Sequence, residues 1–115
     1  MPVIEHFLSL YKLWYQYRDN LPKKSRYTLG DKIDTIFVET LELLFVASYQ
    51  SKEEKLPTLE SALRDIDILK SFVRVAWELH ILDDQKFIIL SEKLLETGRM
   101  LGGWKRGLQA KTPTQ

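Results

Sequence analysis

The sequence predicts an all-α protein that folds as an up-down-up-down antiparallel four-helix bundle. Apolar residues recur at spacings of three and four in four long segments, which is the period of an amphipathic helix. No segment alternates at period two over the length of a strand, and mostly short polar turns separate the helical segments. With 115 residues, 44% of them hydrophobic, the chain has the size of one domain with one core.

The first two helices are predicted on either side of Asn20 and Pro22. The apolar face of the first comprises Ile4, Phe7, Leu8, Tyr11, Trp14 and Tyr15. Because proline lacks an N–H that would be unpaired at a helix start, the second helix is expected from Pro22 to about Tyr49, with Gly30 as its weak point. Its predicted buried face comprises Leu29, Ile33, Ile36, Phe37, Thr40, Leu44 and either Ala47 or Ser48.

The segment SYQSKEEKLP, residues 48–57, is polar and is predicted to be the longest connection. Thr58 is the expected N-cap of the third helix. This helix keeps its apolar period for six turns, through Leu59, Leu63, Ile66, Leu69, Phe72, Val73, Ala76, Trp77 and His80. His80 is therefore interpreted as a packed or interface histidine rather than a metal ligand or a general base.

Asp83 and Asp84 are candidate N-caps for the fourth helix. The residues that it is expected to bury are Phe87, Leu90, Leu94, Gly98, Leu101 and Leu108. One bundle domain is thus predicted over residues 1–110, and residues 111–115 are predicted to be a disordered tail.

Four glycines interrupt the fourth helix in ETGRMLGGWKRGLQ, residues 96–109. Each costs roughly 0.5–1 kcal/mol relative to alanine inside a helix, so the glycines need a reason. Gly98 and Gly102 are four residues apart and share a face. The sequence favours close approach of another helix there over fraying of the helix end.

The residues offer little support for catalysis. The chain has no cysteine, hence no thiolate metal site, and it lacks the Glu-x-x-His motif of di-metal bundles. Asp65 and Asp67 point about 200° apart on a helix, so they cannot form a carboxylate dyad alone. No metal, cofactor or catalytic residue is predicted. Because neither a secretory signal nor a run of apolar residues long enough to span a membrane is present, a cytoplasmic location without membrane contact is expected.

Local basic clusters are the most informative surface feature, because the formal net charge is only +1. Lys23, Lys24 and Arg26 lie in the turn before the second helix, beside Tyr27. Further cations are Lys70, Arg74, Arg99, Lys105 and Arg106, and no acid follows Glu96. Such clusters can bind nucleic-acid phosphates, although the same pattern also occurs on simply solubilising surfaces. In an up-down bundle these residues are expected to form either a strip along the molecule or a surface repeated by oligomerisation, rather than one compact patch.

The segments LPKKSRYTLGDKI, LRDIDILKSFVRVAWELHIL and LLETGRMLGGWKR resemble the Avd-like four-helix bundle proteins. These are the accessory variability determinants of diversity-generating retroelements. The chain is similar as well to bundle proteins encoded in intervening sequences of bacterial large-subunit rRNA genes. The likeness covers nearly the whole chain, and its most specific part is the pattern G-R-x-L-G-x-W that begins at Gly98.

The resemblance implies a non-catalytic accessory protein that assembles as a homopentameric barrel. It also implies binding to the retroelement reverse transcriptase and to its template RNA, or to DNA, in support of mutagenic reverse transcription. Residue by residue, Lys23, Lys24 and Arg26 match the basic turn of the family. Arg64, Lys70 and Arg74 match the partner-facing positions of its third helix. The near-neutral charge keeps an alternative open, a self-assembling intervening-sequence-type scaffold that binds only protein.

Overall fold

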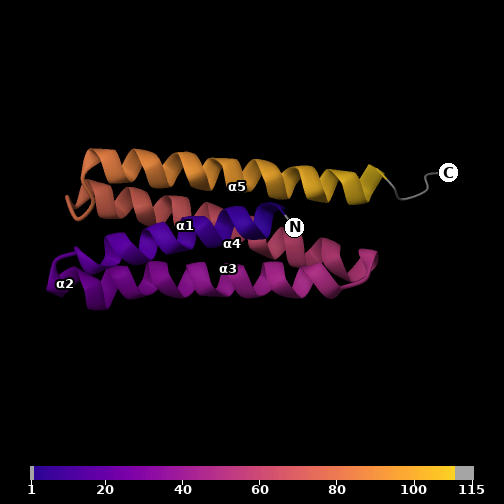
Figure 1. Cartoon of the computed structure of the whole chain (residues 1–115), viewed down its shortest axis with the longest axis horizontal. Helices are drawn as coiled ribbons and strands as arrows, with labels where there is room; N and C mark the ends of the chain where they lie inside the picture. Colours follow the sequence, from indigo (N-terminus) through magenta and orange to yellow (C-terminus); the bar gives the residue numbers. More distant parts are fainter. Residues whose placement is uncertain (1, 111–115) are drawn as a thin grey trace.

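A computed structural model of the chain describes residues 2–110 and contains, over this range, helices and no strand. Four long helices run alternately up and down: α1 (Pro2–Asp19), α3 (Asp31–Tyr49), α4 (Lys52–Glu78) and α5 (Asp84–Ala110) (Figure 1). The all-α four-helix bundle prediction is confirmed. The tail predicted at residues 111–115 lies outside the described residues. No helix within residues 2–110 is both long and apolar enough to cross a membrane.

The helices surround one core in the cyclic order α1, α3, α4, α5. Its largest buried side chains are Trp14, Phe7 and Phe37, and the Phe7 and Phe37 rings stack with centroids 5.3 Å apart. The predicted apolar faces account for most of the core. Trp14, which belongs to the predicted apolar face of the first helix, is fully buried.

The turn between α1 and α3 is wound more widely than an α-helix. The short helix α2 (Lys23–Ser25) is followed by η1 (Arg26–Gly30), a single π-helical turn that leads directly into α3. Gly30 is buried, and a Cβ atom there would lie 3.2 Å from Leu21 Cδ1 and 3.3 Å from the Ser25 carbonyl oxygen. The second helix is predicted from Pro22 to about Tyr49, and residues 23–49 are helical. The range is not one continuous α-helix, however, because it contains a π-turn that ends at Gly30.

The predicted connection over residues 48–57 and the predicted Thr58 N-cap are wrong. Helix α4 begins at Lys52 with Ser51 as its N-cap, seven residues before the predicted cap, because Ser51 and Glu54 form a reciprocal capping box. The Glu54 N–H donates to Ser51 Oγ at 3.3 Å, and the Ser51 N–H donates to Glu54 Oε1 at 3.1 Å. Pro57 lies inside the helix. Lys55 Nζ, one turn into the helix, lies 5.4 Å from the centre of the Trp104 ring of α5, which ties this turn to the bundle.

The turn between α4 and α5 begins two residues earlier than the apolar period indicates. The Ile81 N–H donates to the Ala76 carbonyl at 2.8 Å and the His80 N–H donates to the Trp77 carbonyl at 2.9 Å, which is the Schellman pattern of a helix end. His80 occupies its left-handed position, at φ 61°, and is exposed. The interpretation of His80 as a packed residue is therefore wrong. Asp83 is the N-cap of α5, because its Oδ1 accepts from the Lys86 N–H at 2.8 Å.

The glycines of α5 do not produce the predicted close packing. A Cβ atom at Gly98 would lie 3.8 Å from Lys70 Nζ and 4.0 Å from Ile66 Cγ2 of α4, which is ordinary contact. At Gly102, the side chain within 4 Å among the described residues is Arg106 of the same helix. Helix α5 nonetheless continues to Ala110, so the end of the helix does not fray at Gly102 either.

Candidate nucleic-acid and partner interface

The nine predicted site residues fall into two groups, because α2 and η1 lie at one end of a bundle 55 Å long. The turn group holds Lys23, Lys24 and Arg26. The second group follows α4 and α5 and comprises Arg64, Lys70, Arg74, Arg99, Lys105 and Arg106. The α1–α3 turn and the α4–α5 turn share one end of the molecule, and α5 carries Lys105 and Arg106 toward the other (Figure 1). The prediction of a strip rather than a compact patch is consistent with this placement.

Within the turn group, Lys23 and Lys24 differ from Arg26 in availability. Both lysines are exposed and, among the described residues, neither has a carboxylate within 4.0 Å. The Arg26 guanidinium instead donates to the Asp19 carbonyl at 3.2 Å and to the Leu21 carbonyl at 3.1 Å. Arg26 thereby satisfies carbonyl groups near the end of α1, so its first role is structural.

Most cations of the second group have an acidic partner. Arg74 Nε lies 2.7 Å from Glu78 Oε2, and Lys70 Nζ lies 3.7 Å from Asp67 Oδ1. On α5, Arg99 Nη1 lies 3.8 Å from Glu96 Oε1. These three pairs lie within single helices and are at least partly exposed, and such pairs contribute only about 0.3–0.5 kcal/mol each. A phosphate or a partner carboxylate can therefore replace the helix's own acid at little cost.

The remaining three cations lie on the same two helices. Lys105 Nζ lies 3.2 Å from Glu60 Oε2 and connects α5 to α4. Arg64 donates to Ser61 Oγ at 3.4 Å, and Arg106 has no ion pair among the described residues. Gly98, which lacks a side chain, borders the Lys70 ammonium on this surface. Gly98 of α5 thus lies beside a cation of α4. The spacing of the glycines in the sequence did not predict this contact between the two helices.

The two carboxylates considered for a dyad lie on different sides of α4. Asp65 Oδ2 accepts from the Thr40 hydroxyl of α3 at 3.4 Å, whereas Asp67 pairs with Lys70. Burial, and secondarily the charge of Glu39, raises the pKa of Asp65, while the hydrogen bond from Thr40 acts in the opposite direction. Residues 2–110 hold no group of three histidine, cysteine, aspartate or glutamate residues that could bind a metal ion.

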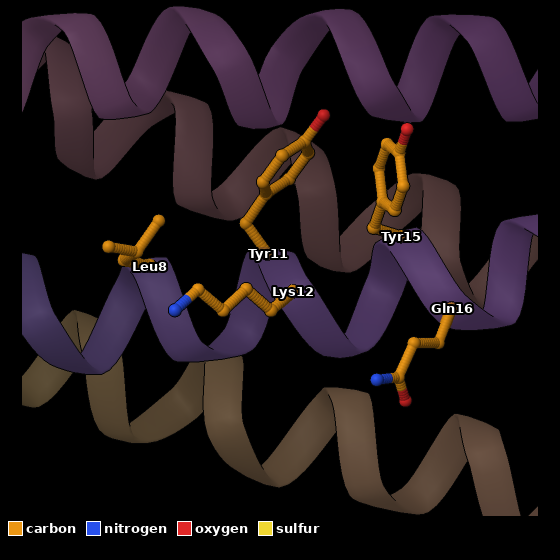
Figure 2. Close-up of a pocket in the computed structure, with 5 residues that line it drawn as sticks. All are labelled: Leu8, Tyr11, Lys12, Tyr15 and Gln16. Carbon is orange, nitrogen blue, oxygen red and sulfur yellow. The ribbon is translucent and has the colours of Figure 1, made fainter.

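A feature that the sequence interpretation missed is an open cavity of about 450 Å³ on the outer side of α1. Leu8, Tyr11, Lys12, Tyr15 and Gln16 line it (Figure 2). Figure 2 shows the rings of Tyr11 and Tyr15 directed toward the neighbouring helix, with Gln16 pointing the opposite way and Lys12 lying along the front of α1. Leu8, Tyr11 and Tyr15 follow the helical spacing of the first helix, but this spacing does not distinguish residues that line an open cavity from residues of a buried face.

Tyr11, one of the residues that line this cavity, is hydrogen-bonded within the bundle. The Tyr11 hydroxyl donates to Asp34 Oδ1 at 2.9 Å, and Trp14 Nε1 donates to the same oxygen at 3.3 Å. Burial raises the pKa of Tyr11 to about 12, and the hydrogen bond to Asp34 and the charge of Asp34 act in the same direction. Near neutral pH Tyr11 therefore remains a protonated donor that holds α1 against α3.

The fold and surface define a class: an antiparallel four-helix bundle whose predicted basic site residues lie along two helices and at one turn. The sequence matches the bAvd-like family over residues 3–108. The chain belongs to the bAvd-like family, which is in general a family of accessory, non-catalytic proteins. None of the curated proteins matches the chain.

Proposed function

We propose that the chain is a non-catalytic accessory protein of a diversity-generating retroelement, which acts in the cytoplasm. In this role it binds the reverse transcriptase and its template RNA, or DNA, and supports mutagenic reverse transcription. The observation that carries the proposal is membership of the bAvd-like family over residues 3–108. Self-assembly into a homopentamer is part of the proposal.

The availability of the cations divides the proposed surface into two parts. Lys23 and Lys24 are exposed and have no acidic partner among the described residues, so they suit phosphate groups without competition. Along α4 and α5, the mixture of cations and acids suits a protein surface with its own charges. We assign RNA first to the turn and the reverse transcriptase first to the strip that contains Arg64, Lys70, Arg74, Arg99, Lys105 and Arg106.

The test of RNA binding compares charge reversals at two places. Fluorescence anisotropy of a labelled single-stranded RNA oligonucleotide gives the dissociation constant over a range of salt concentrations. We expect Lys23→Glu with Lys24→Glu to weaken binding at least tenfold. Loss of two phosphate contacts should also lower the slope of log K against log salt by about 1.4.

A matched control changes the charge by the same amount elsewhere. Lys52→Glu with Lys93→Glu alters two half-buried cations that lie outside the proposed surface, and we expect it to leave the salt slope near that of the parent protein. Equal losses in both double variants would mean that net charge rather than the turn governs binding. Unchanged binding in the turn variant would remove the turn from the RNA contact.

Reverse transcriptase binding is tested by copurification with a tagged reverse transcriptase after nuclease treatment. Arg74→Glu with Arg99→Glu should reduce recovery of the enzyme, whereas Lys23→Glu with Lys24→Glu should not. The reverse pattern would contradict the division of the surface.

A second candidate function is a self-assembling scaffold of the intervening-sequence type that binds protein without nucleic acid. The formal net charge of +1 favours it, because nucleic-acid binding by such a chain rests on local charge segregation alone. An absorbance ratio typical of pure protein in untreated preparations, with no anisotropy change on adding RNA, would select this candidate.

A further inference from the structure

Tyr27, in the π-turn η1, carries an aromatic ring that no other side chain of the bundle holds in place. Tyr11, Tyr15 and Tyr17 each contact another side chain of the chain. Among the described residues, the side chains of Tyr27 and Tyr49 form no hydrogen bond, ring contact or ion pair. Tyr27 is 62% exposed and Tyr49 is 82% exposed. Both rings are therefore free to contact another molecule.

The backbone that carries Tyr27 is held by the residues on either side of it. The Arg26 guanidinium donates to two carbonyl groups near the end of α1. The Thr28 hydroxyl lies 3.3 Å from the carbonyl oxygens of Lys24 and Ser25 and donates back into α2. A ring on a fixed backbone loses little conformational entropy when a ligand binds to it. Single π-helical turns of this kind often occur at functional sites.

Two free cations lie next to the Tyr27 ring. Lys23 and Lys24 precede Tyr27 by four and three positions, and the helical winding is unbroken from Lys23 through η1. Residues at these spacings are neighbours on a helix surface, with roughly 5–6 Å between their Cβ atoms. Neither lysine has a carboxylate within 4.0 Å among the described residues. A ligand on the ring can therefore reach both ammonium groups.

The charge and polarity of this end of the bundle suit a polyanion with an aromatic part. Residues 19–32 hold four cations and two acids. One of these acids, Asp31, is paired with Arg18 at 2.7 Å, and the other, Asp19, is exposed at the end of α1. The exposed ring of Tyr27 stands alone among polar neighbours, whereas protein-binding surfaces expose contiguous apolar patches. A nucleotide combines the anionic group and the flat ring that this arrangement matches.

We propose that Tyr27 is a stacking surface for one unpaired base of a nucleic acid, whose adjacent phosphates bind Lys23 and Lys24. Aromatic side chains beside a basic groove bind single strands in this way, because every base has a π-face. In a duplex the bases are stacked on each other, and a base must leave the stack before a side chain can lie on it. The turn therefore binds single-stranded nucleic acid in preference to duplex.

This inference rests on the proposed function, which assigns nucleic acid to the turn, and adds the class of nucleic acid that the turn selects. The lysines supply attraction that depends on salt and is equal for paired and unpaired strands. Tyr27 is uncharged at neutral pH, so its contribution depends on an accessible base and not on salt. The two contributions can be separated by measurement.

The experiment compares three labelled probes by fluorescence anisotropy. The first is a short single-stranded RNA without self-complementarity, the second is the same RNA annealed to its complement, and the third is a strand of equal length with stable abasic spacers. We expect Tyr27→Ala to weaken binding of the single-stranded RNA by about fivefold or more, with an unchanged salt slope. Binding of the duplex and of the abasic strand should stay as in the parent protein. Tyr27→Phe, which keeps the ring, should bind all three probes like the parent.

Tyr49→Ala is the matched control. Tyr49 is an exposed tyrosine without a side-chain contact among the described residues, and it ends α3 at the far end from α2 (Figure 1). Its replacement should leave all three affinities unchanged. Unchanged circular dichroism melting of the variants excludes a folding defect, which the exposed position of Tyr27 also makes unexpected.

The outcomes separate this inference from the function on which it rests. If Lys23→Glu with Lys24→Glu weakens RNA binding but Tyr27→Ala does not, the turn binds phosphates only and the stacking proposal fails. It also fails if Tyr27→Ala weakens binding of the abasic strand as much as that of RNA, if Tyr27→Phe behaves like Tyr27→Ala, or if Tyr49→Ala causes an equal loss. If the parent protein binds none of the probes, the nucleic-acid part of the proposed function fails, and the stacking proposal with it.

Discussion

Replacement of His80 by glycine should stabilise the protein. His80 stands at φ 61°, in the left-handed position of the Schellman turn that ends α4. A left-handed backbone costs a residue with a side chain about 1–2 kcal/mol. Glycine avoids this cost but loses about 0.5–1 kcal/mol more chain entropy on folding. Among the described residues the exposed imidazole forms no hydrogen bond or ion pair that the replacement would remove, so the net gain is about 0.5–1 kcal/mol.

Urea denaturation followed by circular dichroism measures this gain. At an unchanged slope m of about 1.5 kcal/mol/M, His80→Gly should raise the midpoint by about 0.3–0.7 M. Measurements at low micromolar concentration avoid a contribution from self-association, which would add to the apparent stability.

His80→Ala is the matched control, because it removes the imidazole and keeps a Cβ atom at the left-handed position. It should not stabilise the protein. An equal gain from both replacements would show that the side chain, and not the backbone, is unfavourable. A lower midpoint for His80→Gly would refute the reasoning altogether.

Three further predictions concern the bundle. Burial raises the pKa of Tyr11 to about 12, so Tyr11 keeps its proton in the folded state between pH 10 and 12 while the unfolded chain loses it. The free energy of unfolding should therefore fall by up to about 2 kcal/mol over this range. A pH series of urea midpoints should show the fall, and Tyr11→Phe should abolish it. Ser51→Ala, which removes the capping box of α4, should cost about 1 kcal/mol in the same assay, and no loss would mean that the first turn contributes nothing. Gly98→Ala should raise the melting temperature, because its Cβ atom fits at ordinary contact distance, whereas Gly30→Ala should lower it, because its Cβ atom would crowd Leu21 and the Ser25 carbonyl.

Helical period identified the four helices and most of the core, because burial of one face leaves a repeating trace in the sequence. Phe37, Ile66 and Leu94, each predicted to be buried, are fully buried. The spacing of apolar residues does not predict which of them stay exposed when a neighbouring helix ends or tilts. Tyr15 and Trp14 are adjacent in one predicted helix, yet Tyr15 is 54% exposed and Trp14 is fully buried.

Helix ends were less predictable than helix interiors. Thr58 after Pro57 looks like a start, but the capping box at Ser51 and Glu54 supplies the hydrogen bonds that begin α4 earlier. His80 continues the apolar period by position alone, yet the Schellman bonds from Ile81 and His80 end the helix before it. In both cases the helix end is decided by hydrogen bonds of backbone groups and capping side chains, which the spacing of apolar residues does not indicate.

For the candidate interface, the sequence by itself determined the kinds of charge and their segregation, such as Lys23 with Lys24 in one turn and no acid after Glu96. The tertiary structure decided which cations are free, because Arg26 is bonded to carbonyl groups near the end of α1 while Lys105 binds Glu60 of another helix. It also decided which residues of α1 and α3 meet, because the Phe7 ring stacks on Phe37 and the Tyr11 hydroxyl donates to Asp34. The physical reason is that the apolar period is a property of each helix by itself. The side chains that a residue contacts depend instead on which helices pack together and on how they are aligned along the bundle axis.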